Sequence, residues 1–98
     1  AVTVVLAARD YPASGDAGTP IEGIDAAEDA GALVFHAGTA LHDGQLVTNG
    51  GRILDVTGLG ETAAQARARA YESAALISFD GVRYRRDVAA EAVEREHV

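Results

Sequence analysis

The sequence predicts a small α+β domain, and three observations carry that prediction. Several short runs, the first at residues 2–7, are rich in the β-branched and other apolar side chains that favour strands. A stretch of strong helix formers without Gly or Pro follows these runs at residues 62–77. The length of 98 residues suits one modest hydrophobic core, so we predict a single domain over residues 1–98.

The first third of the chain is predicted to contain one strand and a connector. The nearly continuous apolar run at 2–7 is typical of a strand covered on both faces. Tyr11-Pro12 and then Ser14-Gly15-Asp16 indicate a turn and loop. Residues 19–31 mix Pro, Gly and acidic side chains, which predicts a connector with a short helical turn at 25–30.

The middle of the chain is predicted to consist of strands. Residues 32–41 form a strand that is broken by Gly38. Residues 45–48 and 52–57 are apolar and β-branched, and Asn49-Gly50 lies between them. Because Asn-Gly readily adopts the positive φ angles of a type I′ turn, these two segments are predicted to form a hairpin around Asn49-Gly50.

One longer helix is predicted from Thr62 to about Ile77. Thr62 and Gln65 have the spacing of a capping box, in which each side chain bonds a free N–H at the start of the helix. A stripe of small side chains on one face would let this helix lie close against a sheet. The predicted inner face contains Ala63, Ala66, Ala70, Ala74 and Ile77, and the outer face Gln65, Arg69, Glu72 and Ser73.

The end of the chain is predicted to hold a half-exposed strand and a short helix. Val82 and Tyr84 alternate with Arg83 and Arg85, as in a strand with one solvated face. Asp87 is suited to cap a last helix that runs through about residue 95.

Composition excludes several classes of function. The net charge is −7, with eight arginines and no lysine, so a nucleic-acid partner is not expected. Without cysteine there is no disulfide, thiolate metal site or cysteine nucleophile. No apolar run approaches the roughly 18 residues of a membrane span, so we expect no membrane partner and a cytoplasmic location.

The sequence Thr48-Asn49-Gly50-Gly51-Arg52 is the strongest candidate for ligand binding. A plain hairpin turn already explains Asn49 and Gly50. Gly51 and Arg52 are additional: glycine lets a ligand approach backbone N–H groups, and a guanidinium can hold an oxyanion through two hydrogen bonds. We therefore weigh a structural turn against an anion-binding turn.

The other polar residues are assigned structural or solvent-exposed positions. His36 is expected to be a hydrogen-bonded core or boundary residue rather than a catalyst. His36 and His42 would be about 20 Å apart on an unbroken strand, so they are not expected to share a metal ion unless the chain reverses at Gly38. His97 is expected to be solvated near the chain end, and Arg83, Arg85 and Arg86 are expected on a solvated face. No catalytic residue and no metal ligand is assigned.

Five blocks follow one another along the chain: the opening strand with Tyr11-Pro12, then Val34 to Thr39, Val47 to Gly60, Ala70-Tyr71, and Phe79 to Val88. In this order they resemble the C-terminal domain of the phosphoribosylamine-glycine ligases, also called glycinamide ribonucleotide synthetases, of the ATP-grasp superfamily. The resemblance covers nearly the whole chain. It implies a small β-rich domain of the hybrid-motif, barrel-sandwich-like kind.

The same resemblance implies the function. Ligases of this family use ATP and Mg²⁺ to form a glycyl phosphate, which the amine of 5-phosphoribosylamine attacks to give glycinamide ribonucleotide. The N-terminal and ATP-grasp domains, with the nucleotide and metal sites, would precede this chain and be its partners. By the family pattern Thr48, Asn49, Gly50, Gly51 and Arg52 face the substrate cleft, and Arg52 holds the glycine carboxylate or its phosphorylated form. The domain alone is expected to be inactive.

Two other functional classes compete with this interpretation. Biotinyl and lipoyl carrier modules also present a hairpin tip, but they need a modified lysine, and this chain contains none. A free-standing interaction or regulatory module could retain the fold of the ligase C-domain without the catalytic lobes. The coding region upstream of Ala1 distinguishes this alternative from the ligase.

Overall fold

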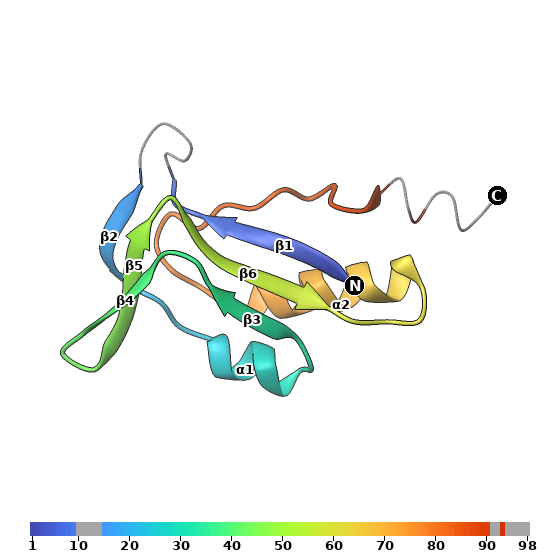
Figure 1. The fold of residues 1–98 in the computed structure, drawn as a ribbon, viewed down its shortest axis with the longest axis horizontal. Helices are drawn as coiled ribbons and strands as arrows, with labels where there is room; N and C mark the ends of the chain where they lie inside the picture. Colours follow the sequence, from blue (N-terminus) through green and yellow to red (C-terminus); the bar gives the residue numbers. More distant parts are fainter. Residues whose placement is uncertain (10–14, 91–92, 94–98) are drawn as a thin grey trace.

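Two small antiparallel sheets and one main helix make up the fold in the computed structural model, which describes residues 1–9, 15–90 and 93 (Figure 1). The predicted α+β class is confirmed. The elements are β1 (Val2–Ala7), β2 (Asp16–Pro20), α1 (Ile24–Asp29), β3 (Leu33–His36), β4 (Thr39–His42), β5 (Gln45–Gly50), β6 (Arg52–Gly58) and α2 (Ala63–Leu76).

Each sheet combines strands that are not all consecutive in the sequence. The first sheet has the strand order β1-β6-β3 and the second has the order β2-β5-β4. All neighbouring strands run antiparallel. The central strands β5 and β6 are consecutive in sequence, so the chain passes from one sheet to the other at Gly51. Figure 1 shows the second sheet at one end of the molecule, turned away from the direction of β1 and β6.

The hairpin predicted around Asn49-Gly50 is wrong. β5 pairs with β2 and β4, whereas β6 pairs with β1 and β3. Asn49 and Gly50 belong to β5 itself and stand opposite Ala17 and Asp16 of β2. An Asn-Gly pair forms a hairpin turn only when its flanking strands pair with each other, and here both strands have other partners.

The predicted strand at 32–41 is two strands, β3 and β4, that join different sheets. The break predicted at Gly38 is confirmed, since Ala37 and Gly38 lie between them. The sequence also predicted no strand at β2. The residues Asp-Ala-Gly-Thr-Pro of β2 carry no alternation of apolar side chains, so this strand depends on its pairing with β5.

The hydrophobic core lies between the first sheet and α2. Alternate residues of β1 and β6, including Leu6 and Leu54, are buried on the face that meets the helix. The alanine stripe is confirmed, because Ala66, Ala70 and Ala74 are buried. A Cβ atom at Gly58 would collide with the backbone of α2, so helix and sheet are in close contact there.

Two expectations about burial need correction. Ser73, predicted on the outer face of the helix, is only 1% exposed, because the inner face of α2 extends across one further row of side chains. The prediction that β1 is covered on both faces is also wrong. Thr3 is exposed and Val5 half-buried, since α2 covers one face of the first sheet and the second sheet lies beside it rather than over it.

The two predicted helix starts agree closely with the structure. The N–H of Gln65 donates to Thr62 Oγ1 at 3.1 Å, which confirms Thr62 as the cap of α2. The reciprocal bond is displaced by one residue, because Gln65 Oε1 accepts from the N–H of Glu61 at 3.0 Å. The short helix predicted at 25–30 is α1, which begins one residue earlier.

The segment after α2 returns along β1. Ala7 and Arg83 exchange two backbone hydrogen bonds of 2.7 and 2.9 Å, which places residue 83 beside the free edge of β1. Of the helix predicted after Asp87, the structure describes Ala90 and Val93 in helical conformation, and the rest of it lies outside the described residues. Tyr11-Pro12, Ser14 and His97 also lie outside them.

Candidate functional site

The segment around Gly38 and the candidate segment at residues 48–52 meet at the corner between the sheets. The N–H of Asn49 donates to the carbonyl of Gly38 at 2.7 Å. On the other side, the N–H groups of Ala37 and Gly38 both donate to the carbonyl of Ile53 at 3.0 Å. The loop between β3 and β4 is therefore attached to the chain on both sides of Gly50-Gly51.

Glycine makes this contact possible. Gly38 is buried, and a Cβ atom on it would collide with the carbonyl oxygen of Arg52 and lie 3.2 Å from Gly50 Cα. A Cβ atom on Gly15 would lie 2.7 Å from the carbonyl carbon of Gly50. Backbones this close leave no room for a side chain, so the path of residues 49–52 is set by contacts from two directions.

The five predicted site residues differ in exposure. Thr48 is 0% exposed, and its Oγ1 accepts a hydrogen bond of 3.0 Å from the N–H of Thr19, which ties β2 to β5. Asn49 and Arg52 are exposed, and Gly50 and Gly51 are half-buried. The structure brings these residues together at one corner, and their contact with a substrate stays a prediction.

Arg52 and Arg83 lie in one row across neighbouring chain segments, which the sequence did not reveal. In the register of the first sheet Arg52 stands opposite Ala7, and Ala7 stands opposite Arg83 on its other side. The guanidinium of Arg83 donates to the carbonyl of Arg9 at 2.8 Å. Among the described residues no ion pair involves Arg52, so its guanidinium is available for an anion. Strand register is the signal that joins these residues, and it is not readable from spacing.

Arg85, unlike Arg52, forms an ion pair within the described part of the chain. Its guanidinium binds the carboxylate of Asp87 at two points, with distances of 3.0 and 2.7 Å. The hydrogen bond from Arg85 lowers the pKa of Asp87 below its ordinary value, and the same bond raises the pKa of Arg85. Both side chains are exposed, as predicted for this face.

His36 and His42 are polar surface groups. His36 Nδ1 lies 2.9 Å from Thr39 Oγ1, and His36 is exposed rather than part of the core. His42 lies 3.5 Å from an oxygen of Asp43. The chain does change direction at Gly38, yet the described residues contain no group of three side chains placed to hold a metal ion.

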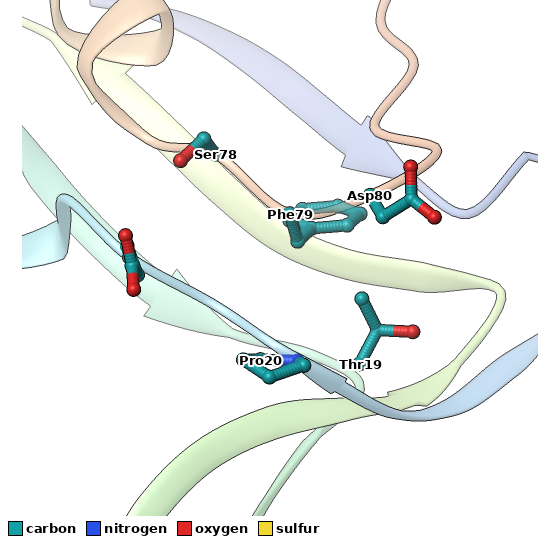
Figure 2. A pocket seen from close by; sticks show the side chains of 6 residues that line it. Thr19, Pro20, Ser78, Phe79 and Asp80 are labelled. Carbon is teal, nitrogen blue, oxygen red and sulfur yellow. The ribbon is translucent and has the colours of Figure 1, made fainter.

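An open hollow of about 440 Å³ lies between β2 and the segment after α2. Figure 2 shows Thr19 and Pro20 on one side and Phe79 on the other. Its acidic groups are Glu22 and Asp80, which do not suit an anionic substrate. None of the corner residues 48–52 lines it, so it is separate from the candidate site.

The comparisons with known proteins identify the family. The family model described as "Phosphoribosylglycinamide synthetase, C domain" matches residues 1–91. This chain belongs to that family. As a phosphoribosylglycinamide synthetase C domain, it is 52% identical over 96 residues to the phosphoribosylamine-glycine ligase of a Neisseria meningitidis serogroup A strain, covering 97% of this chain and 22% of that protein.

Two further relatives extend the comparison. The ligase of the same name from Vibrio parahaemolyticus is 47% identical over 95 residues, which is 97% of this chain and 22% of that protein. The crystal structure of phosphoribosylamine-glycine ligase from Thermotoga maritima matches with a TM-score of 0.72 and 48% identity, over 85% of this chain and 20% of that one. The chain thus spans about a fifth of the length of these relatives. Neither helix of the described residues has the length and apolarity to cross a membrane.

Proposed function

We propose that this chain forms the C-terminal domain of a phosphoribosylamine-glycine ligase of purine biosynthesis. The reaction joins glycine to 5-phosphoribosylamine through a glycyl phosphate, with ATP hydrolysis, and gives glycinamide ribonucleotide. The match over residues 1–91 and the names of the relatives support this function. ATP and Mg²⁺ would bind to the N-terminal and ATP-grasp domains, which are the proposed partners in the same polypeptide, and a cytoplasmic location accompanies the proposal.

The proposed role of the domain is to wall the active site with the corner at residues 49–52. The observation that carries this role is the contact of Gly38 with the carbonyl oxygen of Arg52, because it fixes the backbone position from which the exposed Arg52 side chain projects. Arg52 would hold the glycine carboxylate, or the phosphate on it, through two charge-assisted hydrogen bonds. Asn49 and the N–H groups of the glycines would complete the wall.

The test is Arg52→Ala in the full-length ligase. Loss of charge-assisted hydrogen bonds of about 1.5–3 kcal/mol should raise KM for glycine or lower kcat/KM by about 10-fold to 100-fold. Arg52→Lys keeps the charge but not the two-point geometry, so its loss should be smaller than that of Arg52→Ala yet measurable. Arg69→Ala is the matched control, since Arg69 lies on the outer face of α2 and bonds the carbonyl of Leu59. Unchanged kinetics for Arg52→Ala would leave the corner with a structural role only.

A second experiment concerns the isolated domain. We expect the purified 98-residue chain to form no glycinamide ribonucleotide, because the nucleotide and metal sites would lie in the other domains. Mixing it with those lobes should restore synthesis. Turnover by the chain alone would refute this division of roles.

The alternative is a free-standing interaction module with the fold of the ligase C-domain. The match covers only 22% of the relative's length, and this alternative accounts for that coverage as well as the ligase does. An ATP-grasp coding region upstream of Ala1 supports the ligase, and a stop codon with a ribosome-binding site supports the module.

A further inference from the structure

The first sheet has one face that α2 does not cover. Side chains alternate across a strand, so the residues between those of the core lie on this opposite face. In Figure 1, α2 passes behind β1 and β6, and this face is turned towards the viewer. We call it the outer face and define it by Thr3, Val5, Leu33, Phe35 and Asp55, which register places in neighbouring positions across the three strands.

Large apolar side chains on the outer face are exposed. Phe35 is 54% exposed and Leu33 is 45% exposed, and both belong to β3. Val5 of β1 is half-buried on the same face. A sheet face with polar side chains can remain in water. Large apolar side chains that cluster on an exposed face indicate a contact surface.

Asp55 lies at the centre of this face. It stands opposite Val5 on one side and Phe35 on the other, so apolar side chains flank its carboxylate in both directions. Its Oδ1 is buried, and in the described part of the chain it has no hydrogen-bond partner. By contrast, the neighbouring hydroxyls of Thr3 and Thr57 bond each other at 2.8 Å. Buried polar atoms without a partner are rare and costly, so the Asp55 oxygen needs a donor that the described residues do not supply.

We propose that the outer face is the surface on which the remainder of the ligase packs, and that this remainder supplies an N–H or cationic donor to Asp55. This inference rests on the proposed function. The relatives are more than four times as long as the matched segment, since that segment is 22% of their length. Such a partner has the size to cover a three-stranded face. A basic or N–H donor also complements a carboxylate in a chain of net charge −7.

The absence of cysteine allows a direct test by thiol labelling. Leu33→Cys and Leu76→Cys make the same change at positions of equal exposure, 45% and 46%, but on opposite layers of the fold. Each variant is prepared in the 98-residue chain and in the full-length ligase, and alkylation by a maleimide is followed by peptide mass spectrometry. We expect alkylation at position 33 to slow at least tenfold in the ligase, and alkylation at position 76 to change less than twofold.

A second measurement is the direction in which Asp55→Asn shifts Tm. In the 98-residue chain the substitution removes an unpaired carboxylate, so Tm should stay or rise. In the full-length ligase the substitution replaces the charged acceptor of the proposed hydrogen bond with a neutral one. The bond is then weaker, so Tm should fall by a few degrees (about 2–4 °C).

Failure of this proposal is distinguishable from failure of the proposed function. An active ligase in which position 33 is alkylated as fast as in the isolated chain, or in which position 76 is equally protected, overturns the assignment of this face. The same holds if Asp55→Asn has the same effect on Tm in both proteins. A ligase whose synthesis does not depend on this chain overturns the function, and this inference with it.

Discussion

Gly38 lies against the backbone of Arg52, and a methyl group on Gly38 would overlap the carbonyl oxygen of Arg52. Gly38 lies in the loop between β3 and β4, and Arg52 is the first residue of β6, fourteen positions later in the sequence. This contact joins the loop between β3 and β4 to the candidate segment at residues 48–52, and it fixes the start of β6, from which the Arg52 side chain projects.

We therefore expect Gly38→Ala to destabilise the chain by about 1–3 kcal/mol, the range for overpacking a close contact. Urea unfolding followed by circular dichroism measures this. The control is Ala37→Ser at the exposed neighbouring position, which should stay within about 0.5 kcal/mol. Equal stability of the two variants would show that the corner has room to relax.

The contact between sheet and helix at Gly58 leads to a similar expectation. A Cβ atom there would collide with Ala66 and Ala70 of α2, so Gly58→Ala should push the helix away and cost about 1–3 kcal/mol. Thermal unfolding measures the loss. Ala68→Ser, on the exposed side of the same helix, should cost only about 0.5 kcal/mol from helix propensity. A neutral Gly58→Ala would mean that the alanine stripe is not closely packed.

Tyr71 attaches the segment after α2 to the helix. Its hydroxyl donates to the carbonyl of Arg85 and accepts from the N–H of Val88 at 3.0 Å. Tyr71→Phe should cost about 1–3 kcal/mol for the two bonds and speed hydrogen exchange at the Val88 amide. Tyr84→Phe is the matched control, because Tyr84 contacts the ring of Tyr71 but has no hydroxyl hydrogen bond among the described residues. Unchanged exchange at Val88 would contradict this role of the hydroxyl.

The cap of α2 can be tested at one atom. Thr62→Ala removes the acceptor for the Gln65 N–H and should cost about 1 kcal/mol, whereas Thr62→Asn retains an acceptor and should be nearly neutral. Denaturant midpoints of the three proteins provide the comparison. An equal loss of stability in both variants would show that Thr62 does not stabilise the helix through the hydrogen bond of the cap.

The pairing of Asp87 with Arg85 predicts that the stability of the fold decreases in acid. The hydrogen bond with Arg85 lowers the pKa of Asp87 in the folded chain, below the value of about 3.9 expected when unfolded. The stabilisation is therefore complete above that unfolded value and is lost as the pH falls through the lower folded pKa. An NMR titration of the Asp87 carboxyl should show a midpoint below 3.9, and Arg85→Ala should return it towards 3.9. A midpoint that Arg85→Ala does not move would contradict the pairing.

Local patterns in the sequence predicted much of the fold. The strand at 2–7, the cap at Thr62 and the alanine stripe of α2 depend on residues close together in the chain, and each is found. The break at Gly38 and the exposure of Arg52 were also predictable, because each follows from the residue type. For the same reason, the sequence could single out residues 48–52 as a site, although their contact with a substrate is still a prediction.

Only the tertiary structure decided which strands pair. The Asn-Gly signal is local and favours a hairpin, but pairing energy depends on long-range partners, and β1, β2, β3 and β4 compete successfully for β5 and β6. The same competition creates β2 from a sequence without strand character, aligns Arg52 with Ala7 and Arg83, and leaves Asp55 among apolar neighbours. These features join residues far apart in the chain, so they become definite only when the two sheets are formed.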